Sequence, residues 1–477
     1  MLKLLKHYDV IIIGAGIIGC ATARALSRYR LNALVLEAQD DVTCGASKAN
    51  SGIVHAGYDC YPGTLKAELN VKGAAMFPTL AKELDIPFRV NGSMVLCLRK
   101  EDYPLLETLY KRGQTNEVPG LQIISGEEAY KLEPNLAQGV HSALWAKKAA
   151  IVSPYEAAIA FAENAALNGV EFMLDTEVTQ VGFIPGRHFT VETANEIFSA
   201  DVVINTAGVN SDTIHNYLAQ DAEDKEETLP QRGQYYMLDN AHRDFVNCTL
   251  FPLPGPLGKG VLIAPTTDGN IIVGPNAEEL SEEGDFTDRF DTQTTRAGLD
   301  DVLEKAKLSV ANLPIYGNIT TFAGIRAKHI SKDFILKETL PGFIHALGID
   351  SPGLSAAPAI AEKLMQMAVS RLNPEENPNF NPIRENMKRF HLISYEEQEA
   401  LIRKDSKYGH IVCRCEMVTE AEVVHAIRRP VGARNFDAVK RRTRCRGGRC
   451  QGGFCSLKIA EILSRELGVS EEFIWTY

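Results

Sequence analysis

The sequence predicts an α/β fold for about the first 370 residues and a small helical, cysteine-rich module behind them. Strand-like apolar runs alternate with helical stretches in the first part, which is typical of α/β organisation. Five of the ten cysteines lie between Cys413 and Cys455, whereas the others are scattered from Cys20 to Cys248. At 477 residues the chain is too long for one ordinary domain, so we expect two or three.

The hydrophobic pattern gives the order of elements in the first part. An apolar stretch at 154–168 predicts a helix, and short apolar runs predict strands at 10–13, 33–36, 202–205 and 271–273. Residues 372–385 carry three prolines and four asparagines with little apolar periodicity, which is typical of a linker. We therefore expect a linker over 372–405, between two separate domains.

The charge distribution divides the chain at nearly the same place. The whole chain carries −11, but residues 1–400 carry −17 and residues 401–477 carry +6. An acidic chain disfavours a nucleic-acid partner. The apolar run near the N-terminus is too short to span a bilayer, and no small-residue cleavage site follows it. We therefore expect a cytoplasmic protein, with at most peripheral membrane association through a partner.

The first 40 residues contain the pattern of a dinucleotide-binding turn. A strand leads into Gly14, Gly16 and Gly19, and a helix over 20–28 follows. Gly14 permits the tight turn, Gly16 lets the backbone approach a pyrophosphate, and Gly19 lets the helix pack on the strand. The helix N-terminus offers unpaired N–H groups to phosphate oxygens. Glu37 ends the next strand, where it can accept hydrogen bonds from ribose hydroxyls.

A second loop, 44–57, is rich in small and hydrogen-bonding residues. Together with the segments 203–208, 322–326 and 348–355, it resembles the flavin-contacting pattern of the D-amino-acid-oxidase-like superfamily. This resemblance covers residues 8 to about 370. It implies the following cofactor-binding residues for FAD: Gly14, Ala15, Gly16, Gly19, Glu37, Ala46, Ser47, Asn50, Ser51, Gly52, Val178, Ala207, Gly208, Gly324, Gly353, Leu354 and Ser355.

The same resemblance implies how the first 371 residues are divided. A Rossmann-like FAD-binding domain is assembled from pieces at about 1–80, 145–222 and 320–371. A substrate domain, mainly antiparallel sheet, is inserted between them as pieces at about 81–144 and 223–319. The expected fold class is therefore α/β with an inserted antiparallel β domain and a C-terminal cysteine-rich helical domain.

Within that superfamily, the sequence is most similar to the branch that holds glycerol-3-phosphate dehydrogenases and oxidases and L-2-hydroxyglutarate dehydrogenase. The similarity lies in the segments 51–58, 62–67, 232–236, 258–266 and 274–276. It implies hydride transfer from an alcohol carbon to FAD, with His55, Lys259, Arg326 and Ser351 in the pocket. A histidine titrates near neutral pH and suits a general base, whereas Lys259 and Arg326 suit an anionic tail.

Other interpretations of these residues stay open. His55 can pack on the flavin edge, Lys259 can lie on the surface, and Arg326 can pair in the core. The Gly-Gly-Lys-Leu-Thr-Thr run of larger membrane-associated glycerol-3-phosphate dehydrogenases is absent at 351–357. We expect oxidation of sn-glycerol 3-phosphate to dihydroxyacetone phosphate. A 2-hydroxy acid such as L-2-hydroxyglutarate, an amine or amino acid, and a non-catalytic flavoprotein scaffold are the alternatives.

The C-terminal cysteines form two close pairs. Cys413 and Cys415 form a Cys-x-Cys pair, and Cys450 and Cys455 follow after 34 intervening residues. Two such pairs can supply four thiolates to a [2Fe-2S] cluster. Structural zinc is the alternative, but paired zinc ligands usually have about two to four residues between them. The pattern resembles the bacterioferritin-associated-ferredoxin-like domain, which implies a [2Fe-2S]-binding domain over 406–477. Cys445 is either a bystander or a replacement ligand.

The basic stretch 428–449 accompanies these cysteines. We interpret it as a solvated face that also offsets the negative charge of four thiolates; docking onto an acidic partner and binding to DNA are the alternatives. A cluster beside a flavin implies a dehydrogenase that passes single electrons onward. The expected partner is an electron-accepting protein, either a second flavoprotein or a quinone-linked subunit.

Overall fold

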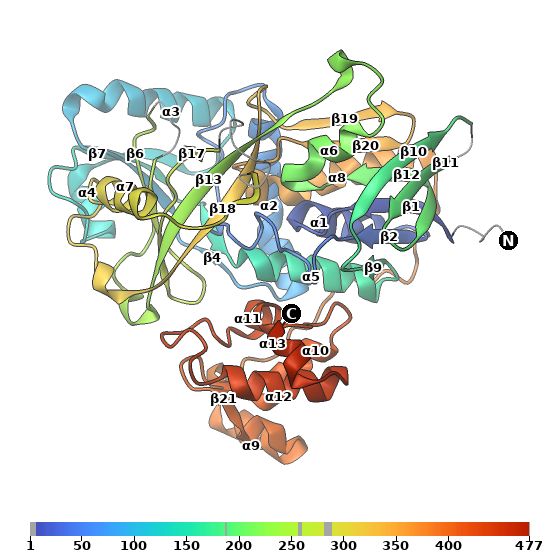
Figure 1. Cartoon of the computed structure of the whole chain (residues 1–477). Helices are drawn as coiled ribbons and strands as arrows, with labels where there is room; N and C mark the ends of the chain where they lie inside the picture. The colour runs from blue at the N-terminus through green and yellow to red at the C-terminus, as the bar shows by residue number, and fades with distance from the viewer. Residues whose placement is uncertain (1–5, 187, 256–259, 281–288, 477) are drawn as a thin grey trace.

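The computed structural model describes residues 6–186, 188–255, 260–280 and 289–476. Figure 1 shows two large sheets side by side, with the C-terminal helices, in orange and red, packed beneath both. The first sheet carries the N-terminal strand, and the second contains the long pair β13 and β18. Both the α/β part and the helical C-terminal part agree with the predicted fold class.

The first sheet is an eight-stranded mixed sheet built around β1. Its path runs β10-β11-β12-β1-β2-β9, and β20 joins β12 and carries β19. The strands β12, β1, β2, β9 and β20 are parallel, as expected for a sheet covered by helices. The bounds are β1 Lys6–Ile13, β2 Ala33–Leu36, β9 Glu171–Met173, β10 Val178–Ile184, β11 His188–Thr193, β12 Ile197–Asn205, β19 Ile335–Leu340 and β20 Phe343–Leu347.

Three helices form the densely packed layer on this sheet. The helix α1 (Ile17–Leu26) is buried along its whole length and contacts both α5 (Pro154–Leu167) and α8 (Gly353–Leu372). Alanines on the facing helices let the backbones approach closely: Ala157, Ala160, Ala356 and Ala359 are all fully buried. The predicted strands and the helix predicted at 154–168 are confirmed.

The second sheet has nine strands and is mostly antiparallel. Its path runs β17-β13-β16-β15-β14-β5-β7-β6, and β18 pairs along most of β13. The bounds are β5 Ser93–Cys97, β6 Leu121–Ser125, β7 Ser142–Ala146, β13 Thr228–Leu238, β14 Thr249–Pro252, β15 Leu262–Pro265, β16 Ile271–Gly274, β17 Glu278–Glu279 and β18 Asn318–His329. Its strands come from two separate parts of the chain.

A small three-stranded sheet, β3-β8-β4, joins the two large ones. Its strands are β3 Ile53–Val54, β4 Phe88–Val90 and β8 Ala150–Val152, and the long helix α2 (Leu65–Leu84) follows β3 and packs on α8. The remaining helices of this region are α3 Tyr103–Thr115, α4 Gly126–Leu132, α6 Ser211–Asn216 and α7 Arg296–Ala306.

The C-terminal module has its own apolar core around Val423, Val439 and Ile459. Its elements are α9 Tyr395–Lys404, β21 Ile411–Cys413, β22 Val418–Thr419, α10 Glu420–Arg428, α11 Phe436–Thr443, α12 Ser456–Leu467 and α13 Glu471–Thr476. The stretch expected to be a linker therefore includes α9. It also includes Arg384, which is buried against Glu163 of α5, because its guanidinium needs a buried carboxylate partner.

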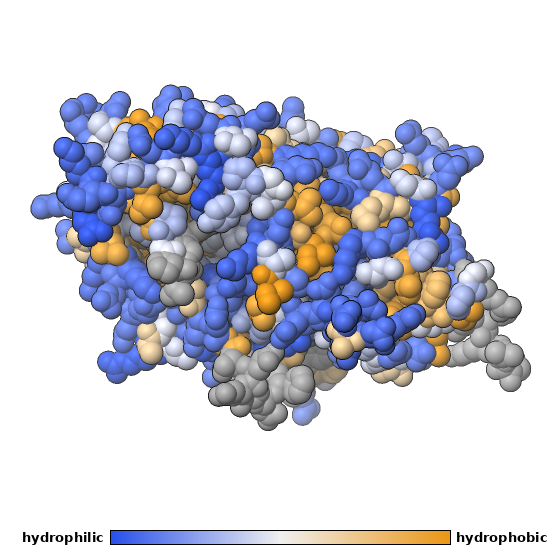
Figure 2. Space-filling view, turned by 90° about the horizontal axis from the view of Figure 1, so that it is seen from above, coloured by the Kyte–Doolittle hydropathy of each residue, from blue (hydrophilic) through white to orange (hydrophobic). Residues whose placement is uncertain are grey.

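Figure 2 views the protein from above, on the side away from the C-terminal module. Hydrophilic residues cover most of this face, and apolar residues lie in separate patches among them. Within the part of the chain that the structure describes, none of the helices has both the length and the apolar character needed to cross a membrane.

Candidate active site and cysteine cluster

The glycine turn after β1 has the geometry that dinucleotide binding requires. Gly14 has φ +97°, and a Cβ there would lie 2.8 Å from the Thr206 carbonyl oxygen. A Cβ on Gly19 would lie 1.9 Å from the Gly14 carbonyl oxygen, so any side chain would separate α1 from β1. The Ala15 amide donates to Glu37 Oε2 at 2.7 Å. The turn and the end of β2 are thus brought together as predicted.

The loop that begins at Cys44 extends this site along α1. The Ser47 hydroxyl accepts a hydrogen bond from the Ile17 amide at 3.0 Å, in the first turn of the helix. Gly16, the residue before that helix, supplies no side-chain cap, and the first N–H groups of a helix have no partner within the helix itself. Among the residues that the structure describes, none has an atom within 4 Å of a Cβ built on Gly45 or Gly208. This open space beside uncapped amides fits a pyrophosphate.

The other predicted cofactor residues lie on the same edge of the first sheet. The Thr206 hydroxyl donates to the Gly14 carbonyl at 2.9 Å, which places Ala207 and Gly208 beside the turn. Val178 begins β10, two residues after Thr176, whose amide donates to the Glu37 carbonyl. The FAD-binding roles of all the predicted cofactor residues stay predictions, including those of Ala46, Asn50, Ser51, Gly52, Gly353 and Leu354.

Three distant segments meet where the two large sheets join. A Cβ on Gly324 of β18 would lie 2.6 Å from the Ala49 Cβ, so only a glycine allows this approach. The Ser355 hydroxyl, at the start of α8, accepts from the His55 amide at 2.8 Å and donates to the Ile53 carbonyl at 3.2 Å. The structure therefore gathers the segments 49–55, 324–326 and 350–355, which the sequence had marked separately.

Arg326 is held at this junction by neutral partners. One Nη donates to Gln231 Oε1 at 2.8 Å, and the other donates to the Asn276 carbonyl at 3.3 Å. The Tyr235 hydroxyl hydrogen-bonds both Arg326 and Ser51, and burial raises the pKa of Tyr235. Arg232, on the same strand as Gln234, is different: it pairs with the carboxylates of Glu278 and Asp291. The hydrogen bonds of Arg326 thus go to neutral groups, whereas Arg232 donates to two carboxylates; the charge of Arg326 acts on the nearby Asp350.

The remaining predicted pocket residues differ in burial, and the structure does not describe all of them. His55 follows β3 and is half-buried, with its ring 5.8 Å from that of Phe251. Ser351 is exposed and precedes a cis proline, Pro352, at the start of α8. Lys259 lies outside the described residues.

A buried ion pair lies at this junction of segments, and the sequence interpretation missed it. The Lys66 ammonium lies 2.5 Å from Asp350, and both side chains are largely buried. Burial raises the pKa of Asp350, although Lys66 and then Arg326 act to lower it. Both residues stand in segments that resemble the family pattern, but 283 residues lie between them in the sequence. Only the fold could show that they pair.

The C-terminal cysteines gather around one point between β21 and α12. Cys413 hydrogen-bonds both Cys445 and Cys455, and Cys415 hydrogen-bonds Cys450. Charge interactions connect Cys413 with Cys415 and with Cys450. Cys413 and Cys455 are buried, Cys450 is half-buried, and Cys415 is exposed. The four predicted ligands therefore form an inner and an outer pair.

The backbone around these sulfurs forms a cradle of N–H donors. The amides of Glu416 and Arg446 donate to Cys413, and the Arg446 amide also donates to Cys455. The Cys450 amide donates to Cys415, and the amides of Gly452 and Phe454 donate to Cys450. The loops turn tightly so that their amides face the sulfurs. Several non-glycine residues in these loops have left-handed backbone conformations: Met417, Arg444, Arg446 and Gln451. Four thiolates with N–H donors on each fit a [2Fe-2S] cluster.

The basic stretch 428–449 is a solvated face only in part: Arg428, Arg434 and Arg449 are exposed, whereas the side chains of Arg441 and Arg442 are buried. Its arginines dock the module onto buried carboxylates of the preceding part, as the acidic-partner alternative proposed, but within one chain. Asp41 is 1% exposed and lies 2.6 Å from Arg441 and 2.7 Å from Arg442. Buried pairs of the same kind join Arg429 with Glu163 and Arg444 with Asp268. Arg449 also pairs with Asp239, but its side chain is 73% exposed. The opposite net charges of the two parts of the chain were the feature of the sequence that indicated this interface.

A polar cavity of about 180 Å³ lies between the module and the second large sheet. Cys415, Glu416 and Gly448 line it from the module, and Asp239 and Asn270 line it from the sheet. A Cβ on Gly448 would lie 2.5 Å from that of Cys415. The cavity therefore reaches Cys415 of the outer cysteine pair.

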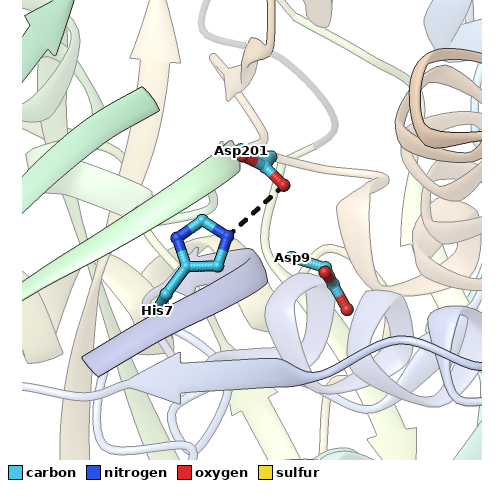
Figure 3. A group of neighbouring side chains, drawn as sticks. All are labelled: His7, Asp9 and Asp201. Carbon is cyan, nitrogen blue, oxygen red and sulfur yellow. Dashed lines mark ion pairs between the residues drawn. The ribbon is translucent and has the colours of Figure 1, made fainter. Parts of the chain in front are cut away.

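A further group of candidate metal ligands lies at the edge of the first sheet (Figure 3). His7 of β1 pairs with Asp201 of β12 at 3.4 Å, and its Nδ1 lies 3.0 Å from the Ser199 hydroxyl. Asp9 accepts from the Asn32 amide at 2.6 Å. These groups already have protein partners and are not deeply buried, so we assign them to the sheet edge and not to a metal.

Comparison with known proteins extends what the geometry indicates. The chain is 44% identical over 465 residues to a glycerol 3-phosphate dehydrogenase of Caloramator mitchellensis, covering 97% of this chain and 95% of that protein. It is 33% identical to a glycerol 3-phosphate oxidase of Mycoplasma pneumoniae, covering 78% of this chain and 97% of that protein. The solved structure of the dithionite-reduced L-alpha-glycerophosphate oxidase from Mycoplasma pneumoniae, with FAD bound, superposes with a TM-score of 0.74 at 30% identity. That match covers 80% of this chain and 99% of the oxidase.

Two family matches cover the two parts of the chain separately. Residues 9–367 match the FAD dependent oxidoreductase family, and residues 411–465 match the BFD-like [2Fe-2S] binding domain. The predicted cofactors, FAD and a [2Fe-2S] cluster, are thereby confirmed. The chain belongs to the FAD dependent oxidoreductase family and ends in a BFD-like [2Fe-2S] binding domain.

Proposed function

We propose that the protein is a dehydrogenase that oxidises sn-glycerol 3-phosphate to dihydroxyacetone phosphate. The observation that carries this proposal is the 44% identity to a glycerol 3-phosphate dehydrogenase across 97% of the chain, the cysteine module included. The pocket supports it, because Arg326 offers a planar guanidinium with neutral partners to an anionic tail. A cytoplasmic location stays a prediction.

The roles of the pocket residues follow from their chemistry. A bound FAD would supply the acceptor for the hydride on C2 of the alcohol, and a bound cluster would supply a carrier for single electrons. His55 accepts the hydroxyl proton as the C2–O bond becomes a carbonyl, which leaves the product as a ketone. Arg326 binds the phosphate, with Lys259 as a second cation and Ser351 as a hydrogen-bonding group. The Ser355 hydroxyl fixes the backbone of His55, so the base is held by α8.

The cysteine module supports an acceptor other than dioxygen. The match to the oxidase of Mycoplasma pneumoniae uses 97% of that protein but covers 78% of this chain. That share of this chain is too small to include both family regions. The matched dehydrogenase covers both. Cys415 is exposed at the outer side of the cluster site, where electrons can leave. We therefore propose an electron-accepting protein, a second flavoprotein or a quinone-linked subunit, as the partner.

Anaerobic reduction of the bound flavin tests the substrate directly. The holoprotein is mixed with millimolar sn-glycerol 3-phosphate, and the loss of flavin absorbance near 450 nm is followed by stopped flow. We expect bleaching with glycerol 3-phosphate and none with L-2-hydroxyglutarate or glycine at the same concentration. Bleaching by L-2-hydroxyglutarate alone would make the protein a 2-hydroxy acid dehydrogenase, and no bleaching by any of the three would favour the scaffold.

Replacing Arg326 by methionine should weaken substrate binding far more than it slows the chemistry. A hydrogen bond to a charged group is worth about 1.5–3 kcal/mol, so we expect the apparent dissociation constant of glycerol 3-phosphate to rise about 10- to 150-fold. The limiting rate of flavin reduction should fall much less. The matched control is Arg296→Met, whose side chain is 96% exposed on α7. An unchanged dissociation constant in Arg326→Met would remove Arg326 from the substrate site.

A further inference from the structure

Large apolar side chains are exposed beside the predicted cluster ligands. Phe454, which directly precedes Cys455, is 79% exposed, and Leu457, two positions after that cysteine, is 68% exposed. Met417 follows Cys415 by two positions and is 47% exposed. A single exposed apolar residue needs no explanation, but three of them around one site indicate a surface that a partner covers.

Exposed cations lie next to these apolar residues. Arg414 directly precedes Cys415, and Lys458 lies in the first turn of α12. The charged groups of Arg414 and Lys458 form no ion pair or hydrogen bond with any residue that the structure describes. Arg449 pairs with Asp239, but most of its side chain stays in solvent. Glu461, one turn further along α12, is an exposed carboxylate and offsets part of this positive charge.

These residues come from two loops that lie against each other. A Cβ on Gly448 would lie 2.5 Å from the Cβ of Cys415, so the loop before α12 packs on the loop after β21. Figure 1 shows α11 next to the FAD-binding part of the chain and α12 further from it. We call the exposed residues around Cys415 the cluster rim, and they are Arg414, Met417, Arg449, Phe454, Leu457 and Lys458.

We propose that the cluster rim docks an acidic electron-carrier protein with an apolar centre, which takes single electrons from the reduced cluster beside Cys415. Each electron leaves the cluster and reduces the carrier, and no covalent bond forms or breaks. Phenylalanine, methionine and arginine are enriched in protein interfaces, where buried aromatic residues supply much of the binding energy. The inference rests on the proposed electron-accepting partner, but it does not depend on which alcohol is oxidised.

The charge of the chain favours an acidic carrier at this place. Residues 1–400 carry −17, so they repel an acidic protein, whereas the cluster rim presents three exposed cations. Complementary charges of this kind mainly raise the rate of association and select the face that is used. The apolar residues of the rim then supply contacts that salt does not screen.

Two charge forms of one acceptor test the docking surface. The probes are native cytochrome c, which is basic, and the same protein with its lysines succinylated, which is acidic. The holoprotein is reduced with dithionite, so no alcohol takes part, and oxidation of its cluster is followed by anaerobic stopped flow at low salt. We expect the acidic form to oxidise the cluster faster than the basic form does, and added salt to remove the difference.

Reversing two charges of the rim should reverse this preference. In the double variant Arg414→Glu, Lys458→Glu, the second-order rate constant with acidic cytochrome c should fall by about 10-fold or more, since steering changes association rates by about 10- to 1,000-fold. Isothermal titration calorimetry of the two oxidised proteins should show weaker binding as well, without any electron transfer. Iron and sulfide are determined first, so that only variants with an intact cluster are compared.

The control changes the net charge equally at a distance from the rim. Lys111→Glu, Arg296→Glu reverses two exposed cations on α3 and α7 and should leave the rate and the binding of acidic cytochrome c nearly unchanged. Phe454→Ser, Leu457→Ser should lower the rate with acidic cytochrome c even at about 1 M salt, where the Debye length is only about 3 Å.

Three results would overturn the proposal. They are equal rates with both forms of cytochrome c, a wild-type rate in the rim charge variant, and binding of the holoprotein to anionic phospholipid vesicles but not to acidic cytochrome c. The last would make the rim a membrane-binding surface. Failure of glycerol 3-phosphate to bleach the flavin, together with the expected cytochrome c results, would reject the proposed substrate and retain the docking surface.

Discussion

Replacing His55 by alanine should lower the rate of flavin reduction by glycerol 3-phosphate about 10²- to 10⁴-fold, the range expected for a missing general base. The hydroxyl proton must leave as the hydride leaves C2, and among the predicted pocket residues only His55 has an ordinary pKa near neutral pH. The backbone amide of His55 donates to the Ser355 hydroxyl, and this bond remains when the side chain is shortened to alanine. The variant should therefore keep its fold and its bound flavin. Stopped-flow reduction under anaerobic conditions measures the effect.

Two comparisons make this result specific to His55. The variant His391→Ala changes an exposed histidine outside the site and should reduce its flavin at the wild-type rate. Dithionite should still reduce the flavin and the cluster of His55→Ala, because this reductant needs no base. A reduction rate within about threefold of wild type would assign His55 to packing against the flavin edge and leave the base unidentified.

Replacing Asp41 by asparagine should destabilise the docking of the cysteine module by about 3–5 kcal/mol, the cost of removing one partner of a buried ion pair. Asp41 is 1% exposed, and both Arg441 and Arg442 donate to its carboxylate. The neutral amide would leave two buried guanidiniums without a counter-charge. We expect faster proteolysis within 373–394 and slower transfer of electrons from flavin to cluster. Limited proteolysis and double-mixing stopped flow measure these effects.

The matched control for the docking variant is Asp300→Asn, whose ion pair with Arg296 is exposed. Exposed pairs are worth about 0–1 kcal/mol, so neither readout should change. Wild-type proteolysis and electron transfer in Asp41→Asn would show that the other three arginine contacts hold the module by themselves. That result would contradict the importance assigned to Asp41.

The pH dependence of docking follows from the same carboxylate. Burial acts to raise the pKa of Asp41, but the guanidiniums of Arg442 and Arg441 more than offset it, and the pKa lies below its usual value. A carboxyl group with a lowered folded-state pKa contributes stability that is fully present above the unfolded value of about 3.8. This contribution is lost as the pH falls through the lower, folded-state pKa. Docking should therefore be constant near neutral pH and weaken only in strong acid.

The nucleotide turn and the cysteine pairs were predictable because each is encoded within a short segment. The strand before Gly14, the helix after Gly19 and the acidic end of β2 are local features. The same holds for the Cys-x-Cys pair and its glycine-rich partner segment. The basic stretch shows where local interpretation failed in part. Several arginines that resemble a solvated face in the sequence are buried in the fold, because Asp41, Glu163 and Asp268 lie opposite them.

The sequence by itself determined the α/β fold class, the two cofactor-binding parts and the candidate base, because turn geometry and thiol spacing are properties of neighbouring residues. The tertiary structure decided which distant groups face one another: Lys66 with Asp350, Arg326 with Tyr235, and Arg441 with Asp41. Contacts of this kind depend on sheet register and helix packing over hundreds of residues. Short segments of the sequence do not predict such contacts, because the contacts form only when distant β-strands pair.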